Sequence, residues 1–198
     1  MWDDHYSKPD YVYGKEPSRF LIKQKQWLVP GQKALAVADG EGRNSVYLAQ
    51  QGLLVTAMDS SSVGIAKAEE LARANDLDID YQLADAKTWD WPTDTYDLVV
   101  AIFIQFAGPE FRLQIFQNMI KTLKPGGILL LHGYTPRQLN YGTGGPSAIQ
   151  NLYTKDILLE AFADLDILNL TEYDCELQEG IGHSGMSALI DLVARKKP

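Results

Sequence analysis

The chain has 198 residues, of which 45% are apolar and 22% are charged, a composition that is ordinary for one soluble globular domain. Its 18 basic and 26 acidic residues give a net charge of −8, and no basic cluster stands out beyond the ARKKP tail, which argues against a nucleic-acid partner. No apolar run approaches the roughly 20 residues that span a bilayer. The acidic, aromatic start and the single Cys175 fit a cytoplasmic protein without membrane contact.

Strand and helix patterns alternate along most of the chain. Uniformly apolar strands joined by amphipathic helices predict an α/β fold with a parallel, doubly wound sheet, which binds its ligands beyond the carboxyl ends of the strands. Helix 109–127 is expected to stop at Pro125-Gly126-Gly127. The expected strands are 32–38, 53–59, 79–85, 96–106 and 128–134, and the expected helices are 17–29, 44–52, 61–76, 109–127 and 154–164.

The last two expected strands, 166–177 and 187–196, are separated by only nine residues. A parallel crossover needs a dozen or more residues, so these strands are predicted to pair antiparallel. The fold class is therefore a seven-stranded, mostly parallel sheet with an antiparallel last strand.

A glycine turn, Asp39-Gly40-Glu41-Gly42, joins the first strand to its helix. Either it brings the backbone close to a small polar ligand at the start of a helix, or it is a tight turn without a ligand. Asp59 closes the second strand, where it can accept hydrogen bonds from ribose hydroxyls or cap the next helix. Asp85, after the third strand, suits the exocyclic amine of adenine or merely begins a loop.

The stretches ALAVADGEGRNSVYLA, MDSS, LADA, YDLVVAIF and LKPGGILLL resemble, in order and spacing, the motifs of class I S-adenosylmethionine-dependent methyltransferases. WDDHYSKPDYVYGKEPSRFL and GYTPRQLNYGTGGP look like the branch that includes the tellurite-resistance TehB proteins and is related to thiopurine methyltransferases. The resemblance implies one methyltransferase domain over 1–198, S-adenosylmethionine as cofactor and a small-molecule methyl acceptor. It implies these cofactor-binding residues: Ala38, Asp39, Gly40, Glu41, Gly42, Asn44, Asp59, Ser60, Asp85, Ala86 and Ile102.

The chain departs from the family pattern at the first motif. Ala36 stands where the family has an acid, and Ala38 stands where it has the first glycine. Asp39 is the replacement expected to bind the cofactor's ammonium group from within the loop. Ala38 fits such a turn at little cost only if its φ is negative.

The acceptor determines whether a catalytic base is needed. An anionic thiolate or chalcogen oxyanion needs none, whereas an oxygen or nitrogen nucleophile benefits from one. His183, between the last two strands, is either that base or a solvated loop histidine, and Arg137 is either a ligand of an anionic substrate or a surface residue. The expected substrate residues are Tyr13, Tyr134 and Arg137.

The domain is expected to divide into an N-terminal lid and helix, a cofactor core, a substrate loop, and a final helix with an antiparallel hairpin. The aromatic start either folds over the cofactor as a lid or packs on the outer helix. These parts correspond to residues 1–29, 30–133, 134–150 and 151–198.

Two other functions stay open. Gly40-x-Gly42-x-x-Ser45 with Asp59 partly imitates a dinucleotide fingerprint, which is typical of an NAD(P)-dependent oxidoreductase. The altered first motif also permits a non-enzymatic protein that binds S-adenosylmethionine. His5 and His132 lack metal-ligand spacing, so no metal is expected, and the sequence does not define an oligomeric state.

Overall fold

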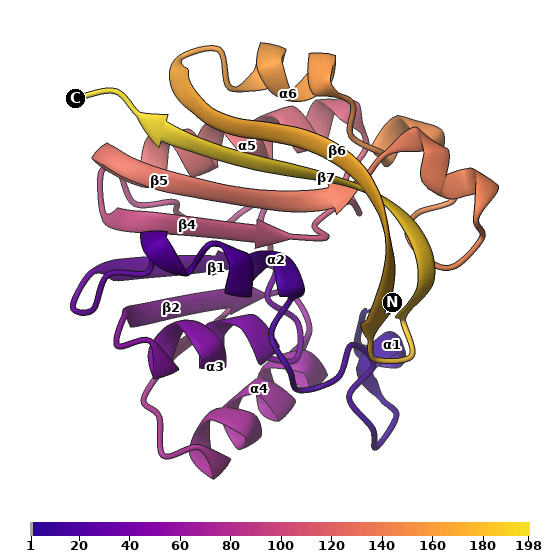
Figure 1. Cartoon of the computed structure of the whole chain (residues 1–198). Helices are drawn as coiled ribbons and strands as arrows, with labels where there is room; N and C mark the ends of the chain where they lie inside the picture. Colours follow the sequence, from indigo (N-terminus) through magenta and orange to yellow (C-terminus); the bar gives the residue numbers. More distant parts are fainter. Residues whose placement is uncertain (1) are drawn as a thin grey trace.

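The computed structural model describes residues 2–198, which form one seven-stranded sheet with helices on both faces (Figure 1). The strand order is β3-β2-β1-β4-β5-β7-β6. The strands are β1 (Lys33–Val37), β2 (Leu54–Asp59), β3 (Asp80–Leu83), β4 (Tyr96–Ile102), β5 (Leu123–Tyr134), β6 (Leu165–Glu179) and β7 (His183–Lys196). The α-helices are α1 (Trp2–Tyr6), α2 (Arg19–Lys23), α3 (Arg43–Gln50), α4 (Ser62–Ala74), α5 (Pro109–Thr122) and α6 (Lys155–Ala161), and the short 3₁₀ helices are η1 (Lys25–Trp27), η2 (Pro136–Asn140) and η3 (Ile149–Asn151).

The pairing of the strands confirms the predicted fold class. Strands β1 to β5 pair with one another in parallel, whereas β7 runs antiparallel to both β5 and β6. The carboxyl ends of β1, β2 and β4 therefore meet at one edge of the sheet, where a parallel α/β fold binds its ligands.

Two apolar layers cover the sheet because its central strands are apolar on both faces. One layer contains Phe116 of α5 together with Leu158 of α6 and the following Phe162. The opposite layer contains Phe20 of α2 and Leu48 of α3. Burial on both faces explains why these strands are continuous apolar runs rather than alternating ones.

Helix α5 ends earlier than predicted. Thr122 is its last residue, and Leu123 has the extended backbone (φ −67°, ψ 136°) that begins β5 and pairs with Tyr96. The expected helix 109–127 therefore extends five residues too far. Lys124 precedes a proline and therefore avoids helical backbone, and Pro125 has no N–H group to donate to a helical hydrogen bond. The helix consequently ends before these two residues.

The final hairpin is longer than predicted. Strands β6 and β7 contain 15 and 14 residues and are joined only by residues 180–182. In Figure 1 the hairpin leaves the sheet and curves toward α1. His183 is consequently the first residue of β7, paired with Glu179, and not part of a loop.

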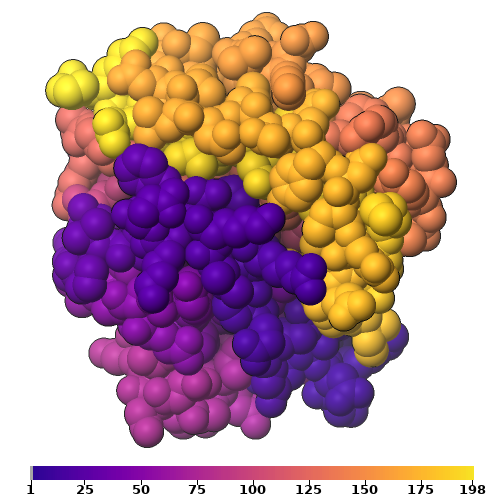
Figure 2. Space-filling view, viewed as in Figure 1, coloured from indigo at the N-terminus to yellow at the C-terminus, as the bar shows by residue number. Residues whose placement is uncertain are grey.

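The N-terminal segment contacts the tip of this hairpin and the start of α4. The amide of Gly182 donates to the carbonyl of Val12 at 3.0 Å, and Figure 2 shows the indigo N-terminal residues adjoining the yellow hairpin. The Asp3 carboxylate accepts hydrogen bonds from Ser61 Oγ (2.6 Å) and Val63 N (3.2 Å). Within residues 2–198, no helix has the length and apolar character required to cross a bilayer.

Candidate functional site

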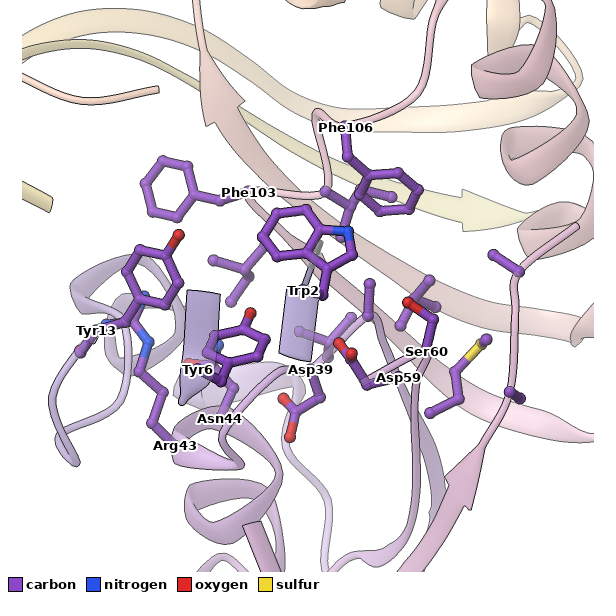
Figure 3. A pocket seen from close by; sticks show the side chains of 18 of the residues that line it. Trp2, Tyr6, Tyr13, Asp39, Arg43, Asn44, Asp59, Ser60, Phe103 and Phe106 are labelled. Atoms are coloured by element: carbon purple, nitrogen blue, oxygen red, sulfur yellow. The ribbon is translucent and has the colours of Figure 1, made fainter. Parts of the chain in front are cut away.

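A cavity of roughly 270 Å³ opens at the carboxyl ends of β1, β2 and β4. The rings of Trp2, Tyr6 and Tyr13 lie over it, so the N-terminal segment covers the same cavity that the sheet edge forms (Figure 3). The residues of its wall that were expected from the sequence are Tyr13, Ala38, Asp39, Asn44, Asp59, Ser60, Asp85, Ala86, Ile102 and His183.

Asp59 connects the first two strand ends. It is 6% exposed, and its Oδ2 accepts from Gly40 N while its Oδ1 accepts from Ser61 N, both at 2.8 Å. Burial raises the pKa of its carboxyl group. Each oxygen has a second lone pair. Asp59 can therefore hold the glycine turn in place and still accept hydrogen bonds from the hydroxyl groups of a ligand in the cavity. Asp85, at the rim, is exposed and accepts from Lys87 N.

Asp39 carries a buried carboxylate oxygen without a partner. Among the residues that the structure describes, its Oδ2 has no hydrogen-bond donor. Burial raises the pKa of this carboxyl group to about 7, and the nearby Asp59 contributes in the same direction. Hydrogen bonds from Ser45, at the start of α3, act in the opposite direction. A buried acceptor without a donor is costly, so a cation that reached this oxygen would be bound there.

Ala38 adopts a left-handed backbone with φ +48°. Alanine was expected to fit this turn at little energetic cost only with a negative φ, and the observed φ is positive. An L residue with a Cβ atom is strained there, and such strain concentrates at functional sites.

Three residues of the expected cofactor set do not line the cavity. Gly40 leaves room for Tyr6 of the N-terminal segment, since a Cβ atom at position 40 would lie 2.7 Å from Tyr6 Oη. Gly42 has φ +90° and leaves room for α4, since its Cβ atom would lie 2.6 Å from that of Ala68. Glu41 is buried and accepts from Val12 N at 2.8 Å. All three act in packing the turn and the N-terminal segment.

His183 belongs to an aromatic wall at one end of the cavity. Its ring centroid lies 4.1 Å from that of Phe103 and 4.3 Å from that of Tyr13. It is 6% exposed, which contradicts the solvated alternative, and its buried Nδ1 has no partner among the described residues. Burial lowers the pKa of this imidazole well below its ordinary value, with Arg43 acting in the same direction, so the ring is neutral.

The cationic side chains near the site are already paired. Arg43 lines the cavity and forms an ion pair with Glu179 at 2.8 Å, in which both side chains are buried. Arg137 is exposed and pairs with Asp174 at 2.6 Å, outside the cavity wall. Tyr134 is buried behind the wall, with its ring 4.6 Å from that of Phe103. Arg137 and Tyr134 therefore do not present their polar groups to the cavity.

Several wall residues were missed by the sequence interpretation. Phe103 follows β4 with φ +57°, a left-handed conformation that no local motif indicates. Trp2 and Phe106 pack edge to face, at 6.2 Å, only because the N-terminal segment folds back. The aromatic richness of residues 1–13 was the one available signal, and it predicts a lid without saying which rings enter the cavity.

Residues 34–127 match a family model described as a methyltransferase domain. Phosphoethanolamine N-methyltransferase 1 of Arabidopsis thaliana is 30% identical over 126 residues, which are 61% of this chain and 24% of that protein. Demethylmenaquinone methyltransferase of Renibacterium salmoninarum is 29% identical over 157 residues, which are 78% of this chain and 61% of that protein. The chain thus spans about a quarter of the first relative's length.

Two solved structures share the fold. One belongs to the conversion of a disulfide bond into a thioacetal group during echinomycin biosynthesis. It has a TM-score of 0.80 and 17% identity, and the match covers 99% of this chain and 90% of that one. TehB from Haemophilus influenzae has a TM-score of 0.74 and 23% identity, covering 100% of this chain and 68% of that one.

The fold, the cavity and the methyltransferase domain matched over residues 34–127 agree with a class I methyltransferase, the class whose cofactor is S-adenosylmethionine. They support the family resemblance that the sequence motifs indicated. The TehB-like branch stays a prediction, because at 23% identity the structural likeness extends to the fold alone.

Proposed function

We propose that the protein transfers a methyl group from S-adenosylmethionine to a small molecule. The observation that carries this proposal is the cavity itself, whose wall contains the carboxylates of Asp39 and Asp59 and, at one end, the aromatic side chains of Tyr13, Phe103 and His183. The sulfonium supplies an activated methyl group, so this chain needs chiefly to orient the acceptor and exclude water.

The residues present fit the cofactor. Asp39 is the residue of the glycine turn that we assign to the ammonium group, because it lies in the cavity wall and its buried Oδ2 has no hydrogen-bond donor among the described residues. Asp59 accepts hydrogen bonds from the ribose hydroxyls through the second lone pairs of its oxygens, and Asp85 accepts a hydrogen bond from the adenine amine at the rim. Ala86 and Ile102 provide apolar wall on either side.

The aromatic end favours an uncharged acceptor. An oxyanion requires a free cation, yet Arg43 is neutralised by Glu179 and Arg137 is engaged outside the cavity. Of the two acceptor classes considered from the sequence, a thiol therefore fits this wall better than a chalcogen oxyanion.

A screen with isotopically labelled methyl donor tests the proposal. Purified protein is incubated with the donor and either small thiols or selenite and tellurite, and labelled product is counted. We expect transfer to thiols above that to either oxyanion. Faster transfer to the oxyanions would overturn the acceptor assignment, while tight donor binding without transfer to any small molecule would favour a non-enzymatic binding protein.

A further inference from the structure

The side chains of His5 and Tyr13 connect the cavity to solvent. Tyr13 lines the cavity and is half-buried, and its Oη lies 3.0 Å from Nε2 of the exposed His5. In Figure 3 the Tyr13 hydroxyl points toward the end of the cavity at which Phe103 lies. The hydroxyl of a residue in the cavity wall thus contacts an imidazole that water can reach.

The Tyr13 ring is held in place from three directions. Its face packs on His183 at a centroid distance of 4.3 Å, and its backbone carbonyl accepts from Arg43 Nη1 at 3.4 Å. At the hairpin tip, a Cβ atom on Gly182 would lie 2.4 Å from the Tyr13 ring, so only glycine permits this approach. These contacts fix the hydroxyl relative to the cavity, which proton transfer requires.

His183 is a poorer base for the same proton. Its imidazole is surrounded by the rings of Phe103, Tyr13 and Tyr134. Protonation would place a charge in a buried site beside Arg43, without a partner for Nδ1 among the described residues. The imidazole of His5, by contrast, can return a proton directly to water.

We propose that Tyr13 and His5 form a relay that removes the proton of a neutral acceptor, an inference that rests on the proposed methyl transfer. As the acceptor's S–H bond breaks, its proton moves to Tyr13 Oη while the Tyr13 proton moves to His5 Nε2. The acceptor's sulfur forms the new bond to the methyl carbon, and the electron pair of the broken carbon–sulfonium bond stays on the donor's sulfur. His5 then releases its proton to solvent.

The test compares two thiols that differ in acidity. Benzyl mercaptan is protonated at neutral pH and needs the relay, whereas para-nitrothiophenol is already a thiolate and does not. Tyr13→Phe keeps the ring but removes the hydroxyl, and His5→Gln keeps a hydrogen-bond acceptor that cannot take a proton. We expect each variant to lower the rate ratio of benzyl mercaptan to para-nitrothiophenol by about 10-fold or more.

His183→Phe is the matched control, because it keeps an aromatic ring at the other contact of Tyr13. It should change the rates with both thiols by a similar factor and so leave their ratio intact. Added imidazole should restore the ratio in the His5→Gln protein. A ratio that falls in His183→Phe but not in Tyr13→Phe would overturn the relay, although transfer to para-nitrothiophenol would still support methyltransferase activity.

A spectroscopic measurement tests the relay independently of turnover. Tyr13 donates to Nε2 in the relay, so nitrogen NMR of the histidine rings should show the His5 proton on Nδ1, and Tyr13→Phe should redistribute this tautomer. A wild-type His5 with its proton on Nε2 would contradict the proposed direction of transfer, whether or not either thiol is a substrate.

Discussion

The buried carboxylate of Glu41 forms an ion pair with the partly buried ammonium group of Lys67, at 2.8 Å, and this pair anchors the N-terminal segment. Lys67 Nζ also donates to the carbonyls of Lys8 (2.6 Å) and Asp10 (2.9 Å), while Glu41 accepts from Val12 N. The pair joins the loop before α3 and the middle of α4 to residues 8–12 of the N-terminal segment. Glu41 therefore holds the N-terminal segment in place.

Replacing Lys67 by Met should destabilise the protein and loosen residues 8–12. The change leaves the Glu41 charge buried without its partner, which costs about 3–5 kcal/mol in comparable pairs. Urea unfolding measures the loss, and limited proteolysis should cut residues 8–12 faster in the variant.

Lys124→Met is the matched control, because its ion pair with Asp97 is far more exposed. It should cost less than about 1 kcal/mol. If both variants lost equal stability, the Glu41–Lys67 pair would not anchor the segment as described.

Ala38→Gly should raise the free energy of unfolding. Relief of the left-handed strain at φ +48° outweighs the larger unfolded-state entropy of glycine, for a net gain of about 0.5–1 kcal/mol. Ala36→Gly, two residues earlier in the extended backbone of β1, removes a buried methyl group without strain to relieve and should lose about 1 kcal/mol. Chemical denaturation of the two variants checks the sign, and a destabilised Ala38→Gly protein would refute the strain.

Asp39→Asn should flatten the pH dependence of stability in the cofactor-free protein. The folded-state pKa of Asp39 is raised to about 7 from 3.8, so between these values the folded state binds the extra proton. Stability from this group is fully present below about pH 4 and is lost as pH rises to about 7. The difference in unfolding free energy between wild type and Asp39→Asn, measured from pH 4 to pH 8, isolates this effect.

The same variant should bind S-adenosylmethionine more weakly above pH 7, where the wild-type carboxylate is ionised and can pair with the ammonium group. Equal affinity of the two proteins at pH 8 would remove Asp39 from the cofactor site. If the difference in unfolding free energy between wild type and Asp39→Asn were constant with pH, the buried carboxyl group of Asp39 would have an ordinary pKa.

Asp59→Ala should weaken cofactor binding by about 1–3 kcal/mol and also lower stability, because Gly40 N and Ser61 N lose their buried acceptor. Asp85→Ala should weaken binding with stability nearly unchanged, since its carboxylate is exposed and bonds only to Lys87 N among the described residues. Calorimetric titration and thermal melting separate the two effects. A folded Asp59→Ala protein with wild-type affinity would exclude Asp59 from the site.

The sheet was predictable because its evidence is local. Apolar strand runs and helical spacing place each element from its own residues, and the nine-residue connection alone excludes a parallel last strand. The end of α5 was misplaced because Pro125 and its glycines resemble a helix stop, while the backbone had already become extended at Leu123.

The cofactor edge was partly predictable for the same reason. Asp39, Asp59 and Asp85 follow parallel strands, and such strand ends converge in any sheet of this order. The role of Glu41 was not predictable, because Lys67 lies 26 residues away and only the packing of α4 brings it near. The aromatic wall likewise depends on the left-handed backbone of Phe103 and on the folding back of residues 2–13.

Calorimetric titration of the wild-type protein with S-adenosylmethionine, S-adenosylhomocysteine and NAD tests the central claim most directly. We propose that Asp59 accepts hydrogen bonds from one ribose and that Asp39 binds an ammonium group, which NAD does not have, so the site suits one nucleoside rather than two. We predict saturable binding of one molecule of either S-adenosyl compound and no binding of NAD. Binding of NAD without binding of S-adenosylmethionine would contradict the account.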